Sequence, residues 1–285
     1  MQHPSEQPRT LGILAGGGRL PAQVAAAAQA AGRAVFIVGL EGFAEKQVIA
    51  PWPHEIIRMG AVGRILGALR THGCHDLVMI GPVRRPSIFD LRPDAEGAKI
   101  AARIGRAAFG GDDGLLAAVV KVLGDEGFRV LGAHEIFQAA LGPRGILSRT
   151  EPDAQAMADI ERGVAVARVL GSADVGQGCV VQLGIVLAVE AVEGTDAMLS
   201  RCGDLKRAGP GGVLVKVVKP GQERRADLPT IGPDTIHNAA AAGLRGVAFE
   251  AGATILADRE ASVAAANAAG LFLLGLDPET MQHGR

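Results

Sequence analysis

Aromatic residues are scarce in this chain of 285 residues: they make up 3% of it, with one tryptophan and no tyrosine. An excess of charge is also missing, because 29 lysines and arginines face 30 acidic residues and leave a formal net charge of -1. Nucleic-acid-binding domains carry a basic field, and those that bind single strands stack bases on aromatic rings. The composition therefore argues against a protein that binds nucleic acid.

The chain also lacks closely spaced cysteines and long apolar runs. The three cysteines, Cys74, Cys179 and Cys202, are far apart and form no CxxC pair, which argues against disulfides and structural zinc. The longest apolar run, 180–192, is interrupted by Gln182 and glycine and is shorter than the roughly 20 residues of a membrane-spanning helix. The first ten residues are polar and do not form a signal peptide. We expect a soluble, cytoplasmic protein.

The first half of the chain alternates apolar strands with helices. A buried strand is predicted at 11–15, a helix at 21–31 that begins at Pro21 and ends at Gly32, and a second strand at 34–38. Strand, glycine loop, helix and strand within about 30 residues are typical of a βαβ unit in a parallel sheet. The same alternation continues with helices at 62–72, 95–107 and 115–123 and strands at 76–80 and 128–131.

The alternation of strands and helices is interrupted at Leu141 to Pro152, which contains two prolines and two glycines. We predict an N-terminal α/β domain at 1–142, a linker at 143–152 and a C-terminal α/β domain at 153–285. The second domain is expected to contain helices at 153–170, 233–242 and 262–269, and strands at 178–183, 185–190, 213–218, 247–250, 254–256 and 271–274. The fold class is α/β, with a substrate cleft between two domains and a Rossmann-like N-terminal one.

A glycine loop, Gly16-Gly17-Gly18-Arg19, follows the first strand and leads into a helix. Such a loop can hold an anion, because free N–H groups and the helix dipole point at it. The dinucleotide fingerprint needs a third glycine that Pro21 replaces. The loop resembles the opening of sugar-nucleotide transferases, but the lysine of that motif is missing. A tight turn without a ligand is the alternative interpretation.

Two further stretches of the first half follow predicted elements. Arg84 and Arg85 come directly after a strand, where ligands bind in open parallel sheets, and they can donate to phosphate oxygens. A solvated basic loop explains them equally well. Asp113, in the stretch GGDDGLL, is either functional or the cap of the next helix.

The second half concentrates acids and bases. Glu190, Glu193 and Asp196 recur every three residues after an apolar strand. A loop punctuated by glycine and proline then gathers the basic residues Lys216, Lys219, Arg224 and Arg225 with Asp227. Mg²⁺ takes carboxylates together with phosphate oxygens, and nearby cations neutralise a phosphoryl group. Solvated charge is the alternative, but acids, bases and rigid backbone together favour phosphate chemistry.

Seven motifs in register over residues 11–276 resemble the UDP-2,3-diacylglucosamine pyrophosphatases of the LpxI type. They are LGILAGGGRLP, GPVRRPSIFDLRPD, GDDGLL, DVGQG, AVEAVEGTD, GVLVKVVKPGQERRADLPTIGPDT and AGLRGVAFEAG. The resemblance implies hydrolysis of UDP-2,3-diacylglucosamine to UMP and 2,3-diacylglucosamine 1-phosphate (lipid X), a step of lipid A biosynthesis. It also implies a divalent cation, most simply Mg²⁺, and peripheral contact with the cytoplasmic face of the inner membrane. Formation of a homo-oligomer is left open.

The site predicted on these grounds centres on Asp227, as a catalytic residue and as a metal ligand together with Glu193 and Asp196. The predicted substrate-binding residues are Gly16, Gly17, Gly18, Arg19, Arg84, Arg85, Asp113, Gln177, Thr195, Lys216, Lys219, Gln222, Arg225 and Thr230. A nucleotidyltransferase and a non-catalytic, nucleotide-binding regulatory protein are the alternative functions.

Overall fold

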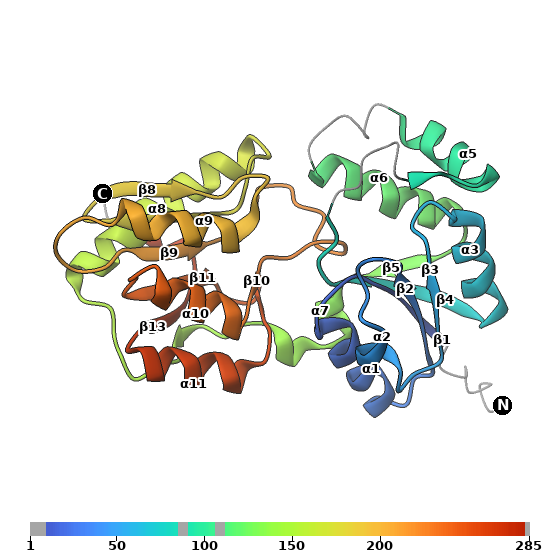
Figure 1. Ribbon diagram of the computed structural model, residues 1–285, viewed down its shortest axis with the longest axis horizontal. Coiled ribbons are helices and arrows are strands. Elements are labelled where there is room, and N and C mark those ends of the chain that lie inside the picture. The colour runs from blue at the N-terminus through green and yellow to red at the C-terminus, as the bar shows by residue number, and fades with distance from the viewer. Residues whose placement is uncertain (1–9, 85–90, 106–111, 283–285) are drawn as a thin grey trace, which may run out of the picture. The chain divides into compact units, whose positions relative to one another are not determined.

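The computed structural model describes residues 10–84, 91–105 and 112–282 (Figure 1). The chain divides into two compact units. Unit 1 comprises Met1–Gln138 and, separately, Glu223–Asp227, and unit 2 comprises Ala139–Gln222 and Leu228–Arg285. Each unit has its own sheet. No helix in the described part of the chain is long and apolar enough to cross a membrane.

Unit 1 is built on a parallel sheet of five strands in the order β3-β2-β1-β4-β5. This order is that of doubly wound, dinucleotide-binding folds, and the prediction of a Rossmann-like N-terminal domain is confirmed. The strands are β1 (Thr10–Ala15), β2 (Val35–Leu40), β3 (His54–Ile57), β4 (Cys74–Ile80) and β5 (Arg129–Leu131). The helices are α1 (Leu20–Ala30), α2 (Lys46–Ile49), α3 (Val62–Thr71), α5 (Ala95–Ile104), α6 (Asp112–Asp125) and α7 (Ala133–Ile136).

Helices cover both faces of this sheet (Figure 1). On one face, Val24 and Ala28 of α1 pack with Ile13 and Ile37 in a buried cluster. On the other face, a second cluster joins α3 and α6 to Phe36, Val38 and Leu77 of the strands. Strands buried on both faces explain why β1, β2 and β4 are almost continuous apolar runs in the sequence.

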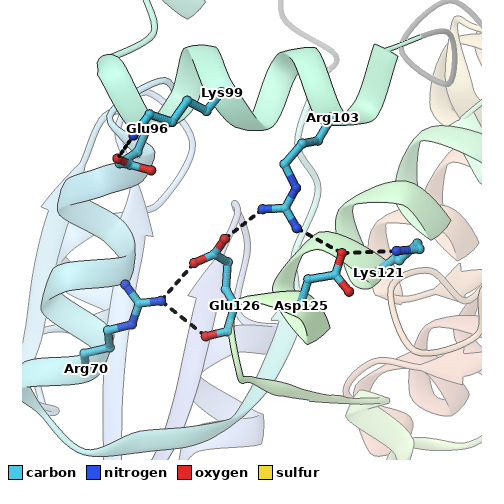
Figure 2. A network of polar contacts seen from close by, with 7 residues as sticks. All are labelled: Arg70, Glu96, Lys99, Arg103, Lys121, Asp125 and Glu126. Carbon is cyan, nitrogen blue, oxygen red and sulfur yellow. Dashed lines mark hydrogen bonds and ion pairs between the residues drawn. The ribbon is translucent and has the colours of Figure 1, made fainter.

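A network of charged side chains ties α3, α5 and α6 together at the surface of unit 1 (Figure 2). The carboxylate of Glu126, which follows α6, accepts hydrogen bonds from Arg70 (3.0 Å) and Arg103 (2.8 Å). Arg103 also donates to Asp125 (2.9 Å), to which Lys121 donates in turn (3.1 Å). These helices follow strands of one sheet, so the network adds lateral contacts to the packing beneath it.

Unit 2 contains a mixed sheet of six strands in the order β6-β13-β11-β9-β7-β8. The strands β8 (Ile185–Val189), β9 (Val213–Lys216), β11 (Gly246–Glu250) and β13 (Phe272–Leu276) run in one direction, whereas β6 (Gly145–Ile146) and β7 (Gly178–Gln182) run in the opposite direction. A separate pair joins β10 (Thr230–Ile231) and β12 (Ile255–Leu256). The α/β prediction for this half is confirmed.

Helices also cover both faces of the sheet of unit 2. Ile160 and Val164 of α8 (Ala154–Ser172) pack on Val213 and Val215 on one face. The other face contacts the three remaining α-helices through Met198, Ile236 and Ala266, among others. These helices are α9 (Gly194–Cys202), α10 (Pro233–Ala241) and α11 (Arg259–Ala269).

The observed division differs from the predicted one in three respects. Residues 139–142, predicted as the end of the N-terminal domain, belong to unit 2. Gly145 and Ile146, in the stretch predicted as a linker, pair with β13, and Leu147 donates to the carbonyl of Leu273, so this stretch is part of unit 2. The segment Glu223–Asp227 belongs to unit 1, although the chain on either side of it belongs to unit 2. Ala226 packs against the hydrophobic cluster around α3, which accounts for that placement.

Candidate functional site

The polar groups of unit 2 gather where β9 ends and β7 begins. Because β7 is antiparallel to both of its neighbours, its first residue, Gly178, lies opposite Lys216 at the end of β9. Glu190 follows β8 directly and donates its N–H to the carbonyl of Gly178 (2.9 Å). Ligands bind outside the carboxyl ends of parallel strands in open α/β sheets. Lys216 and Glu190 therefore occupy the edge at which a ligand is expected.

Lys216, Thr195 and Glu190 form a buried chain of contacts at this edge. The Nζ atom of Lys216 donates to Oγ1 of Thr195 (2.6 Å), and the Thr195 hydroxyl donates to Oε1 of Glu190 (2.5 Å). Nζ of Lys216 also lies 3.5 Å from the same Oε1, and the two charged side chains are only 4% and 10% exposed. The other oxygen, Oε2, is buried and has no hydrogen-bond partner among the described residues. Buried charges of this kind are retained when they are paired.

The motif DVGQG, residues 174–178, forms hydrogen bonds with the loop that follows Lys216. Asp174, in a left-handed backbone conformation (φ 51°), accepts from Nζ of Lys219 (2.7 Å). The carbonyl of Gln177 accepts from the N–H of Val217 (3.0 Å), and its side-chain oxygen accepts from the amide of Gln222 (3.2 Å). Four predicted substrate-binding residues, Gln177, Lys216, Lys219 and Gln222, are thus brought together.

The two glycines of this motif allow the backbone to approach Glu190 closely. An added Cβ atom at Gly176 would lie 2.1 Å from the carbonyl oxygen of Glu190. At Gly178 it would lie 2.8 Å from Oε2 of Glu190 and 3.3 Å from Cγ of Lys216. Glycine is therefore required at both positions, because a larger residue would clash with the backbone or the side chain of Glu190.

A hollow of about 430 Å³ opens along the same edge of the sheet, beside β11 and β13. Glu250, the last residue of β11, lines it and accepts from the N–H of Val218 (3.0 Å), two residues beyond Lys216. An ion pair of Arg144 and Asp277 (3.6 Å) lies at the hollow. Glu250 therefore connects this hollow to the segment that follows Lys216.

The segment Glu223–Asp227 carries the predicted catalytic residue. Arg225 donates through Nε and Nη2 to the two oxygens of Glu223 (2.7 and 2.6 Å), and this contact lowers the pKa of the Glu223 carboxyl. The N–H of Asp227 donates to the carbonyl of Glu223 (3.0 Å), which closes a turn. Ala226 is packed on the core of unit 1, so the position of Asp227 is set by that unit.

The glycine loop meets the loop after β4, at the point where the strand order of unit 1 reverses. The N–H groups of Gly16 and Gly17 donate to the carbonyls of Ile80 (2.9 Å) and Pro82 (3.0 Å). A Cβ atom at Gly16 would lie 2.5 Å from the carbonyl oxygen of Gly81. Close backbone packing explains Gly16, as the tight-turn interpretation allows, and binding of substrate by the glycines stays a prediction.

The remaining predicted residues lie in varied surroundings. Arg19 occupies the N-cap position of α1 without a capping hydrogen bond from its side chain and is exposed, as is Arg84, whereas Arg85 lies outside the described residues. Asp113 lies in the first turn of α6. Gly18 has a positive φ of 73°, and the Thr230 hydroxyl donates to the carbonyl of Leu228 (3.3 Å).

The predicted metal ligands are engaged with protein groups. Arg201 donates to Glu193 (2.8 Å), and this hydrogen bond lowers the pKa of the Glu193 carboxyl. Asn238 donates to Asp196 (2.9 Å). Over the described ranges, no group of three or more histidine, cysteine or acidic side chains is placed to hold a metal ion. The observed side chains of either unit do not form a ready cation site, and we derive no chemical step through a metal.

Cysteine chemistry does not contribute to this site. All three thiols are buried. Burial raises the pKa of Cys74 to about 11 and that of Cys179 to about 12. A nucleophilic cysteine needs a lowered pKa and access to substrate, so these thiols are structural.

Glu190 and Asp174 are the residues that the site prediction left out. Glu190 belongs to the series of acids that the sequence shows, but an acid after a strand is also a common helix cap. The signal that identifies it is the combination with Gly176 and Gly178, since two glycines one residue apart indicate a close approach of another chain segment.

Comparison with known proteins gives matches in both halves of the chain. Residues 10–140 match the profile of the LpxI N-terminal domain, and residues 143–274 match that of the LpxI C-terminal domain. A protein of Caulobacter vibrioides named UDP-2,3-diacylglucosamine pyrophosphatase LpxI is 47% identical over 277 residues, which are 95% of this chain and 99% of that protein.

Proposed function

Because the chain belongs to the LpxI family, we propose that it hydrolyses the pyrophosphate bond of UDP-2,3-diacylglucosamine and releases UMP and 2,3-diacylglucosamine 1-phosphate. The enzyme class is that of a hydrolase acting on a phosphorus anhydride. The observation that supports this most directly is the buried ammonium of Lys216 at the carboxyl edge of β9, next to Lys219 in the following loop.

The charge of the substrate explains why such lysines are needed. A pyrophosphate diester carries two negative charges that repel an incoming nucleophile. Lys216 is suited to neutralise charge on a phosphoryl oxygen, because burial strengthens its field compared with that of an exposed lysine. Both lysines face a carboxylate, but Lys219 donates directly to Asp174 (2.7 Å) whereas Lys216 lies 3.5 Å from Glu190, so Lys219 serves mainly to hold the loop.

Water must be oriented and partly deprotonated as it attacks phosphorus. We assign this role to Asp227, whose carboxylate can accept the proton of water while the P–O bond to the leaving phosphate breaks. The packing of Ala226 against the core of unit 1 supports this proposal, because it holds the backbone next to Asp227. Arg225 and the loops after β1 and β4 are proposed to bind the nucleotide part of the substrate.

The lipid part of the substrate places the enzyme at a membrane surface. We propose peripheral contact with the cytoplasmic face of the inner membrane, where the acyl chains of the substrate reside, and a role in lipid A biosynthesis. We propose that the reaction requires a divalent cation. Of the predicted ligands, Glu193 would have to leave Arg201 and Asp196 would have to leave Asn238 to bind it.

Incubation of the purified protein with UDP-2,3-diacylglucosamine and Mg²⁺ tests the proposal. Release of UMP and of the diacylated sugar phosphate in equal amounts, detected by mass spectrometry, is the expected result. Formation of UTP on addition of diphosphate would show a nucleotidyltransferase instead. Binding of the substrate without turnover would show a regulatory protein.

A further inference from the structure

The carboxylate of Glu190 holds an unusual position, since one of its oxygens takes two contacts and the other is buried without a partner among the described residues. We propose that Glu190 is a positioning residue that acts through Thr195 to hold the ammonium of Lys216 in the orientation in which it meets a phosphoryl group. The inference rests on the proposed function, because it assigns a task to the lysine of that site.

The direction of the hydrogen bonds determines the role of Thr195. An ionised carboxylate only accepts, so the single hydroxyl proton of Thr195 points to Glu190. A lone pair of the same oxygen then faces Lys216, which donates to it. Thr195 therefore has no proton left for a phosphate oxygen while Glu190 is ionised. It acts as a bridge between Glu190 and Lys216, rather than as a direct donor to the substrate.

The lysine keeps donors for a ligand. An ammonium group has three N–H bonds, and the contact with Thr195 uses one of them. That contact fixes the rotation of the group, which otherwise turns freely at the end of a flexible chain. Glu190, 3.5 Å away, supplies the opposite charge that a lysine with 4% exposure requires. Position and charge of Lys216 thus depend on the same carboxylate.

The surrounding backbone is built around this arrangement. Gly176 and Gly178 leave room for the backbone and side chain of Glu190, and Gly178 faces both Oε2 and the stem of Lys216. These two close approaches hold the Glu190 carboxylate beside Lys216 at the edge where a ligand is expected. The energetic benefit of fixing Lys216 falls on the transition state, in which charge develops on the phosphoryl oxygens.

Five variants of the full chain test this role, one of them the double variant of Glu190→Gln and Thr195→Val. Glu190→Gln removes the charge and keeps the shape, Thr195→Val removes the bridge, and Thr195→Ser restores the hydroxyl. Glu161→Gln, at an exposed position of α8 in the same unit, is the matched control. Circular dichroism and thermal unfolding establish that each variant is folded before kcat and KM for UMP release are measured.

We expect Glu190→Gln and Thr195→Val each to lower kcat by about 10-fold to 100-fold with a smaller change in KM, as for other preorganised charge contacts. Thr195→Ser should retain kcat within about threefold, and the double variant should lose no more than the worse single one, because the residues act as a unit. Wild-type kcat in folded Glu190→Gln, or equal losses in the serine and valine variants, would overturn the inference.

A binding measurement separates this inference from the proposed function. Should the wild-type chain release no UMP, the proposed function fails, and titration calorimetry with UDP then decides the role of Glu190. Glu190→Gln and Thr195→Val should weaken UDP binding by at least about threefold, since a misplaced ammonium loses contact with phosphate. Thr195→Ser and Glu161→Gln should bind as the wild type does. Equal UDP affinity in all variants would contradict the inference.

Discussion

The Nζ atom of Lys219 lies 2.7 Å from Oδ1 of Asp174, and this ion pair joins the turn before β7 to the loop after β9. The lysine is buried (8% exposed) and the aspartate is partly exposed (27%). Three residues beyond Lys219 the chain leaves unit 2 and enters the segment Glu223–Asp227. The pair therefore anchors the chain just before the predicted catalytic residue.

The first prediction concerns this anchor. Asp174→Asn removes the charge but tolerates the left-handed backbone, and we expect it to destabilise unit 2 by about 1–3 kcal/mol, because the buried lysine loses the opposite charge of Asp174. Asp174→Ala should cost about 1 kcal/mol more, since alanine is strained at φ 51°. Urea unfolding monitored by circular dichroism measures both, and equal stability of wild type and Asp174→Asn would contradict the account.

The second prediction concerns the buried carboxylate of unit 1. Burial by itself would raise the pKa of Asp76, but hydrogen bonds from Arg129 (2.8 and 2.9 Å) and Arg33 (2.6 Å) outweigh it and lower the pKa. Because the pKa is lower in the folded state, Asp76 stabilises the protein above its unfolded pKa of about 3.9, and the contribution is lost as the pH falls through the folded value.

Asp76→Asn should therefore destabilise unit 1 at pH 7 by about 2–3 kcal/mol, less than a fully buried pair because Arg129 is 69% exposed. The difference from the wild type should shrink below about pH 4. Urea unfolding at pH 7, 5 and 3 measures it. A difference that stays constant over this range would show that packing, rather than charge, is responsible.

Much of unit 1 could be predicted from the sequence because its strands are buried on both faces. The runs around Ile13, Ile37 and Val78 are continuous and apolar, and glycine or proline marks the helix between the first two. β3 was not predicted, since His54 and Glu55 place polar residues in a short strand between Pro53 and a turn. β3 forms because it pairs with β2, and its own sequence does not indicate this pairing.

Sequence motifs predicted which residues belong to the candidate site, but they did not predict the contacts that these residues make. Lys216, Lys219 and Gln222 were selected from one loop, and the structure shows that DVGQG, some forty residues earlier, holds that loop. The placement of Glu223–Asp227 in unit 1 depends on the small side chain of Ala226 and a distant core. Local patterns carry no signal for such long-range packing.

The third prediction concerns the divalent cation. We expect EDTA to abolish UMP release and Mg²⁺ to restore it, because a pyrophosphate is hydrolysed most readily when its charge is shielded. If Glu193 is a ligand, Glu193→Gln should raise the Mg²⁺ concentration for half-maximal activity by about tenfold, a typical effect of losing one ligand contact. An identical Mg²⁺ dependence would place the cation elsewhere, and full activity in EDTA would exclude the requirement.

The last prediction is that Asp227 is essential for turnover. Its turn is closed by the hydrogen bond to the carbonyl of Glu223 and anchored by Ala226, so Asp227→Asn should leave the backbone in place and remove only the charge. We expect Asp227→Asn and Asp227→Ala to lose at least about 10²-fold in kcat, the scale of a positioned acid–base group, with the melting temperature and substrate affinity retained. Asp204→Asn, at an exposed position of unit 2, is the control for the same chemical change. Near-normal turnover of Asp227→Asn with Mg²⁺ would make Asp227 a structural residue and assign the activation of water to another carboxylate.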